Sequence, residues 1–167
     1  MNKETQLPQY LIPEATTIGH VHLKVSDLEQ SLQFYCDILG FSLKMRFGNS
    51  AAFVAAGKYH HHIGLNTWQS AGMPPAPNRG VGLYHAAILL PTRANLAAMF
   101  LRLQEAGVPL EGMSDHGVSE ALYLNDPDNN GLEIYWDKPM EHWPINADGE
   151  LEMYTKALDL KSLLAEL

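Results

Sequence analysis

The sequence predicts an α+β fold built from two copies of a unit with the order strand, helix and three strands. Residues 18–25 alternate polar and apolar side chains, which is typical of a strand, and a helical pattern follows them. The same order restarts after a segment rich in proline and glycine. The interval from His20 to His85 nearly equals that from Gly40 to Gly107, the glycines expected to end the two helices. An internal repeat of this kind constrains the fold more strongly than a single motif does.

The first unit is expected over residues 17–68. Ser26 and Glu29 have the spacing of a capping box, and apolar side chains then recur at helical spacing as far as Gly40. Glycine and asparagine separate the short strands that follow, which are expected at 41–48, 50–57 and 61–68.

The second unit is expected over residues 81–138 and repeats this order. A strand and a helix are predicted at 82–90 and 91–107, and three strands at 108–113, 119–126 and 131–137. Residues 139–167 form a tail beyond the two units. Its apolar side chains predict an amphipathic helix that covers one edge of the sheet: Leu151, Tyr154, Leu158 and Leu163 or Leu164.

Composition excludes several classes of protein. The chain has 167 residues, of which 46% are hydrophobic and 18% charged, an ordinary globular mixture. Its net charge is −8 and it has no basic run, so a nucleic-acid partner is not expected. No apolar stretch approaches the ~20 residues of a membrane span, and the apolar core of a signal peptide is absent. The chain also has a single cysteine, which cannot form a disulfide within the chain. A cytoplasmic location without membrane association is therefore expected.

Two stretches, "HVHLKVSDLEQSLQFYCDILGF" and "YLNDPDNNGLEIY", resemble the vicinal-oxygen-chelate superfamily. That superfamily includes glyoxalase I, extradiol ring-cleaving dioxygenases, fosfomycin-resistance transferases and bleomycin-resistance proteins. The resemblance extends over residues 17–138 and is closest to the small bacterial catechol-2,3-dioxygenase-like proteins. It implies that the two βαβββ modules form a half-open, curved sheet around one metal site.

In such a pair of modules, the first and last strands of each module face one cavity. His20 and His85 stand on the two first strands, and Glu133 stands on the last strand of the second module. Two histidines and one carboxylate form the facial triad that suits non-haem Fe(II), with Mn(II) as a second option. His22 shares the face of His20 by alternation, so it is either the true ligand or a neighbour that orients one.

The fourth position of the cavity is occupied by Gly64, which aligns with Glu133. Glyoxalase I would carry a metal-binding glutamate there, so the resemblance to isomerases is incomplete. Three consecutive histidines, residues 60–62, precede Gly64. The resemblance to extradiol dioxygenases points to His61 as an acid–base residue, whereas simple alternation from Gly64 would place His62 on the inner face.

The same resemblance assigns roles to two further residues. Tyr123 lies ten positions before Glu133, where extradiol dioxygenases have a tyrosine that hydrogen-bonds the substrate oxygen. His116 resembles a histidine that contacts the substrate or supports the site in that family. Apolar walls of the cavity are expected from Phe53, Trp68, Leu83 and Met73.

These residues indicate an Fe(II)-dependent extradiol dioxygenase that acts on a small aromatic diol with O₂. The alternatives are a metal-dependent isomerase of the glyoxalase type, a thiol transferase, and a metal-free protein that binds a small molecule or antibiotic. The two modules can complete one site within a single chain, and the sequence is equally compatible with a homo-oligomer.

Overall fold

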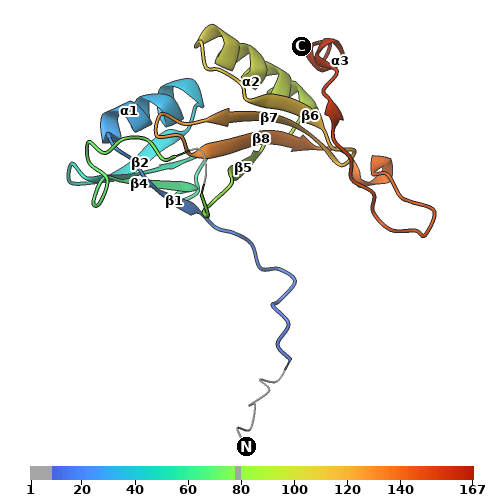
Figure 1. Ribbon diagram of the computed structural model, residues 1–167, viewed down its shortest axis with the longest axis horizontal. Helices are drawn as coiled ribbons and strands as arrows, with labels where there is room; N and C mark the ends of the chain where they lie inside the picture. The colour runs from blue at the N-terminus through green and yellow to red at the C-terminus, as the bar shows by residue number, and fades with distance from the viewer. Residues whose placement is uncertain (1–8, 78–79) are drawn as a thin grey trace, which may run out of the picture.

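The computed structural model describes residues 9–77 and 80–167, and it contains two open, mixed sheets of four and five strands (Figure 1). The helices lie on one side of the sheets, whereas the segment that leads to the N-terminus leaves from the other side. Within these ranges, no helix is both long enough and apolar enough to cross a membrane. The predicted α+β architecture with two repeated units is confirmed.

The first sheet has the strand order β1-β4-β3-β2. β1 runs parallel to β4, and the other neighbouring strands are antiparallel. Because a parallel pair needs a long connection, the helix and two antiparallel strands lie between β1 and β4 along the chain. The elements are β1 (Val21–Lys24), α1 (Leu28–Leu32), η1 (Gln33–Ile38), β2 (Ser42–Phe47), β3 (Ala51–Ala55) and β4 (Ile63–Asn66).

The second sheet has the order β5-β8-β7-β6-β9, in which β5 runs parallel to β8. The pair β5 and β8 therefore corresponds to the pair β1 and β4 of the first sheet. The second sheet has one additional strand, β9, at its outer edge. The elements are β5 (Ala86–Leu89), α2 (Arg93–Glu105), β6 (Gly112–Asp115), β7 (Ser119–Asn125), β8 (Gly131–Asp137), η2 (Met140–His142), β9 (Lys156–Ala157) and α3 (Leu160–Leu164).

The first helix begins at a different cap from the predicted one. Asp27 is the N-cap, and its side chain accepts a backbone N–H of the first turn. The backbone N–H of Ser26 donates instead to Asp128, and Glu29 forms an ion pair with an arginine of β2. The expected capping box is therefore wrong. The helix continues as the π-helix η1, and Gly40 follows it with a left-handed φ of 85°, as predicted.

Two other elements differ from the prediction. β6 begins at Gly112 rather than at residue 108, because Pro109 has no N–H to donate to the ladder. The amphipathic helix expected from Leu151 is limited to α3. Leu151 instead forms an isolated bridge with Ile145, and the chain then pairs as β9 with β6. The tail therefore covers the sheet edge by hydrogen bonding in place of a helix.

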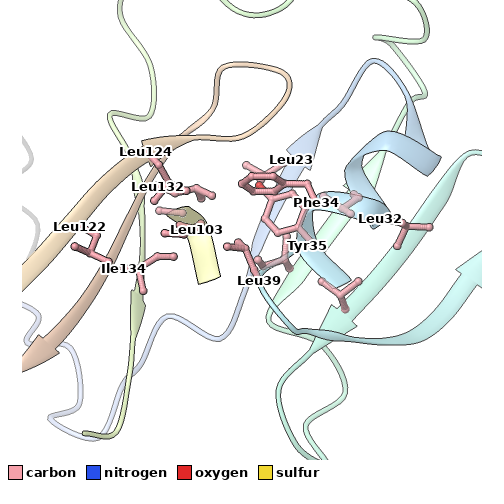
Figure 2. Close-up of a cluster of buried hydrophobic side chains, with 14 of the residues drawn as sticks. Leu23, Leu32, Phe34, Tyr35, Leu39, Leu103, Leu122, Leu124, Leu132 and Ile134 are labelled. Atoms are coloured by element: carbon pink, nitrogen blue, oxygen red, sulfur yellow. The ribbon is translucent and has the colours of Figure 1, made fainter. Parts of the chain in front are cut away.

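The two units share one hydrophobic core. Figure 2 shows part of this cluster, in which side chains of both units meet. The first unit contributes Leu23, Leu32, Phe34, Tyr35 and Leu39, and the second contributes Leu103, Leu122, Leu124, Leu132 and Ile134. Alternation along the strands sends these side chains toward the helices, so the opposite face of each sheet is left for polar and aromatic residues.

A buried polar junction also joins the units, through the loop between β7 and β8 (residues 126–130, the junction loop). The hydroxyl of Tyr35 donates to Oδ2 of Asp126 at 2.9 Å. Oδ1 of the same carboxylate accepts two backbone N–H groups of the loop. The N–H of Ser26 donates to Oδ2 of Asp128 at 3.0 Å. Both carboxylates are buried, so their hydrogen bonds fix the loop against the first helix.

Burial sets the protonation behaviour of this junction. It raises the pKa of Asp126 above the usual value, although hydrogen bonds from Asn130, Tyr35 and Asp128 act in the opposite direction. Burial and the negative charge of Asp126 raise the pKa of Tyr35 well above 10. The phenol of Tyr35 therefore keeps its proton and remains a hydrogen-bond donor in the folded protein.

Replacing Tyr35 with phenylalanine is expected to lower the free energy of unfolding by about 1.5–3 kcal/mol, because the Asp126 carboxyl loses a buried hydrogen bond. Above pH 10 the unfolded chain releases the phenol proton that the folded chain keeps, so wild-type stability falls as pH rises. In Tyr35→Phe, this contribution to the dependence of stability on pH is absent. Denaturant titrations at neutral and alkaline pH measure both effects. Tyr10→Phe is the control, since Tyr10 is exposed; equal stability of the two variants would contradict the prediction.

Candidate active site

His85 and Glu133 lie side by side where β5 meets β8. His85 precedes β5 by one residue rather than standing within it, and Glu133 pairs with Ala87 in the parallel register. Nε2 of His85 is 3.0 Å from Oε2 of Glu133. When two ligand atoms each lie ~2.1 Å from one octahedral metal ion and the angle between them at the ion is 90°, they are ~3 Å from each other. The pair therefore has a spacing that fits two neighbouring metal ligands.

A close backbone approach holds His85 in this place. A Cβ atom on Gly131 would lie 2.2 Å from the carbonyl oxygen of Tyr84, so only glycine allows this contact beside β8. Nδ1 of His85 is buried and has no hydrogen-bond partner among the described residues. An unpaired buried polar atom costs about 1–3 kcal/mol. The contact of Nε2 with Glu133 is therefore the polar interaction that orients the ring.

Tyr123 and His116 extend the polar contacts away from Glu133. Tyr123 stands directly opposite Glu133 in the ladder of β7 and β8. Its hydroxyl oxygen lies 2.9 Å from Oε1 of Glu133 and 2.7 Å from Nε2 of His116. Burial, and then the hydrogen bond and negative charge of Glu133, raise the pKa of Tyr123 well above 10. The structure thus brings four of the predicted residues into one row of polar contacts, with Tyr123 protonated.

The remaining predicted residues gather at the first sheet. His20 precedes β1 by one residue, and its ring lies 4.5 Å from that of His61. His61 also contacts Phe53, with ring centroids 4.9 Å apart. Its Nδ1 lies 2.8 Å from Nδ1 of His60, so one of these nitrogens carries the shared proton. Burial lowers the pKa of His61, and the positive charge of the neighbouring histidines, His20 first, acts in the same direction.

The two groups of residues are separate. Across residues 9–77 and 80–167, no three His, Cys, Asp or Glu side chains lie close enough together to hold a metal ion. His85 and Glu133 are paired, whereas His20 lies against His61. In chemical type, two imidazoles and one carboxylate fit a ferrous ion, and two of these three donors are already adjacent.

The structure distinguishes between the histidines of the triple run. The ring of His62 lies against Tyr59 and Phe41, and its Nδ1 accepts the backbone N–H of Ala56 at 3.2 Å. His61, in contrast, lies against His20 and Phe53. The backbone of His62 bonds to both neighbouring strands, through its N–H to Val54 and through its carbonyl to Val21, but its ring lies toward Tyr59 and Phe41.

His22 occupies the space that a fourth ligand would need. It pairs with Gly64 in the register of β1 and β4, and a Cβ atom on Gly64 would lie 2.9 Å from its ring. Phe53 and Trp68 flank the same ring at 5.8 and 5.6 Å. Two of the four predicted apolar walls therefore contact His22, although Trp68 is exposed, as are Met73 and Leu83.

Sequence reasoning missed the contacts of His116 with the tail. Nδ1 of His116 lies 3.1 Å from the carbonyl oxygen of Tyr154 and 3.2 Å from Oγ1 of Thr155. Neither residue type indicates such a role, because the main contact is made by backbone that every residue has. The close approach at Gly131 was also missed, although the glycine after two asparagines is a signal for it.

Comparison with known proteins relates this arrangement to a family. The sequence profile of the Glyoxalase/Bleomycin resistance protein/Dioxygenase superfamily matches residues 17–134. A catechol-2,3-dioxygenase of Bacillus subtilis (strain 168) is 43% identical over 156 residues, which are 93% of this chain and 53% of that protein. A biphenyl-2,3-diol 1,2-dioxygenase of Rhodococcus globerulus is 31% identical over 72% of this chain and 63% of its own length.

The solved structures agree in fold. The crystal structure of a glyoxalase/dioxygenase from Nostoc punctiforme superposes with a TM-score of 0.64 at 18% identity, and the match covers 80% of this chain and 99% of that one. The chain spans about half the length of the Bacillus subtilis protein. On the profile match, the repeated βαβββ units and the 43% identity, the chain belongs to the glyoxalase/bleomycin resistance protein/dioxygenase superfamily.

Proposed function

We propose that this protein is an extradiol dioxygenase that cleaves a catechol-type diphenol with O₂ at a non-haem Fe(II). The observation that supports this proposal most strongly is the row His85, Glu133, Tyr123 and His116, each within 3.0 Å of the next. A carboxylate between a histidine and a protonated tyrosine offers a metal ligand and a hydrogen-bond donor at one place. The names of the dioxygenases matched by the sequence point in the same direction.

The proposed metal ligands are His20, His85 and Glu133. This set leaves three coordination positions open, enough for both oxygens of a diol and for O₂. Bound Fe(II), or Mn(II) in its place, would supply Lewis acidity toward the diol hydroxyls and a site for O₂. His22 is the competing candidate for the first-sheet ligand, and its exposed ring contacts Phe53 and Trp68 rather than His61.

The protein side chains would manage the protons. The lowered pKa keeps His61 neutral, and where its Nδ1 donates the shared proton to His60, the lone pair on its Nε2 is free to accept a proton. Tyr123 keeps its own proton and can donate a hydrogen bond beside Glu133. The ring-opened product would contain both atoms of O₂, one in its carboxylic acid group and one in its aldehyde group.

The same geometry disfavours a glyoxalase-type isomerase. A glutamate at position 64 would have to place its Cβ within 2.9 Å of the His22 ring. The first sheet therefore excludes the fourth ligand as long as His22 keeps its position.

The activity is tested with an oxygen electrode. Protein purified anaerobically and loaded with Fe(II) is expected to consume one O₂ per molecule of catechol and to form a yellow ring-opened product. Methylcatechols, chlorocatechols and hydroquinone complete the panel, and Glu133→Ala should be inactive. If no diphenol caused oxygen uptake and the protein instead formed thiol adducts from methylglyoxal or fosfomycin, the protein would be an isomerase or a transferase and the proposal would be wrong.

The metal ligands are tested by substitution. His20→Ala, His85→Ala and Glu133→Ala should each lose stoichiometric Fe(II), because each removes one of three donors. His22→Ala should retain the metal, because His22 is not one of the three proposed donors. Metal analysis of anaerobically loaded, gel-filtered protein, with circular dichroism as a check on folding, measures the loss. Iron retained by His20→Ala but lost from His22→Ala would transfer the ligand assignment to His22.

The role of His61 is tested by His61→Asn. Turnover should fall by ~10²–10⁴-fold, the usual contribution of an acid–base residue, while Fe(II) content stays unchanged. His62→Asn is the matched control and should leave turnover unchanged, because its ring lies against Tyr59 and Phe41. A large loss in His62→Asn with none in His61→Asn would assign the role to His62.

A further inference from the structure

The charged residues are divided unevenly along the chain. Residues 38–104 contain six lysines and arginines and no aspartate or glutamate, although the whole chain has a net charge of −8. Residues 139–155, which follow β8 and end before β9, contain four carboxylates and no lysine or arginine. Such a division gives one molecule a positive and a negative surface, which attract each other between two molecules.

The acidic segment forms an arm that extends from the body of the protein. In Figure 1 it is the orange loop at the end of the molecule opposite β2. A bridge between Ile145 and Leu151 closes the arm (residues 140–153) as a hairpin. Four of its apolar side chains are 48–74% exposed: Met140, Ile145, Leu151 and Met153.

The carboxylates of the arm point to contacts outside the chain. All four are exposed, and none forms an ion pair within residues 9–77 and 80–167: Glu141, Asp148, Glu150 and Glu152. The turn of the hairpin is held instead by Oδ1 of Asn146, which accepts the backbone N–H groups of Asp148 and Glu150. The shape of the arm therefore does not use the charges that it carries.

The matching positive surface is the outer edge of the first sheet. β2 is the last strand in the order β1-β4-β3-β2, and all six of its residues are exposed. Nζ of Lys44 donates to the carbonyl oxygen of Gly57 at 2.6 Å, which brings it beside Lys58. Neither lysine has a carboxylate partner among the described residues, whereas Arg46 is paired with Glu29.

The two units differ in how this edge is covered. The strand of the second unit that corresponds to β2 is β6, and β9 pairs with its outer edge. In the part of the chain that the structure describes, β2 has no strand on that side. Leu43, Met45 and Phe47 add apolar surface, since they are 44–64% exposed. An open edge strand of this kind can pair with a second chain.

We propose that the arm of one copy of this chain binds the β2 edge of a second copy, with its carboxylates beside Lys44 and Lys58. A second copy is the partner because the two surfaces are opposite in charge and each also exposes apolar side chains. They lie at opposite ends of the molecule, so one chain cannot join its own arm to its own β2 (Figure 1). A two-fold axis forms the contact twice and closes the assembly as a dimer. This association does not depend on the proposed activity.

The first test is the mass of the wild-type protein in solution, measured by sedimentation velocity. A dimer is expected at low ionic strength. It should dissociate more readily as salt is added, because the Debye length falls from ~30 Å at 0.01 M to ~3 Å at 1 M. A mass of one chain at low salt, at the highest protein concentration measured, would overturn the proposal.

The second test reverses the charges on each surface separately. Lys44→Glu with Lys58→Glu should weaken self-association by ~10-fold or more, because like charges then meet at both contacts. Glu150→Lys with Glu152→Lys should do the same, since the new lysines meet Lys44 and Lys58. An equimolar mixture of the two variants should recover the dimer, because each contact again joins opposite charges.

The control for the arm variant is Glu105→Lys with Glu111→Lys. It changes the net charge equally at exposed positions outside the arm, so it should associate like the wild type. Circular dichroism checks folding, and Lys44→Gln with Lys58→Gln replaces the reversal if that variant unfolds. Self-association of either charge-reversed variant with wild-type affinity, or a mixture that stays monomeric, would show that the arm does not bind the β2 edge.

Discussion

The hydrogen bonds that Asp126 and Asp128 accept across the boundary between the two units are the constraint on which the rest of the structure depends. Each sheet contributes one half of the candidate site, so the site exists only while the sheets keep their relative placement. The hydrophobic core fixes that placement loosely, because apolar contacts have no direction. The bonds from Tyr35 and Ser26 to the buried carboxylates add direction, and misplacing them would leave charged oxygens unpaired.

The two halves of the site differ in their degree of order. On the second sheet, Glu133 is held by His85 on one side and Tyr123 on the other, so its carboxylate has little freedom. On the first sheet, the histidines contact one another mainly through their rings, which constrain position less than hydrogen bonds do. A site with one rigid half and one adaptable half can accept a ligand while keeping a defined frame.

Much of this arrangement is readable from the sequence, because strand alternation and the repeat are strong signals. They gave the bounds of β7 and β8 closely, whereas the resemblance to the superfamily was needed to bring His85 and Glu133 to one cavity. Alternation could not decide between His61 and His62, because the ring contacts that separate them, of His61 with His20 and of His62 with Tyr59, are set by the fold and not by the strand period. The contact of His116 with the tail was out of reach, since it is made by a carbonyl group and by a strand of two residues.

The pairing of His22 with Gly64 bears on how such proteins change activity during evolution. In the second unit, the equivalent pair is Ala87 with Glu133, a small residue beside a large one in the opposite order. Introducing a second carboxylate at position 64 alone would collide with the imidazole of His22, and replacing His22 alone by a smaller residue would open a void. Each single step is unfavourable while the double exchange conserves volume. In this chain, substitutions at positions 22 and 64 are therefore expected to depend strongly on each other.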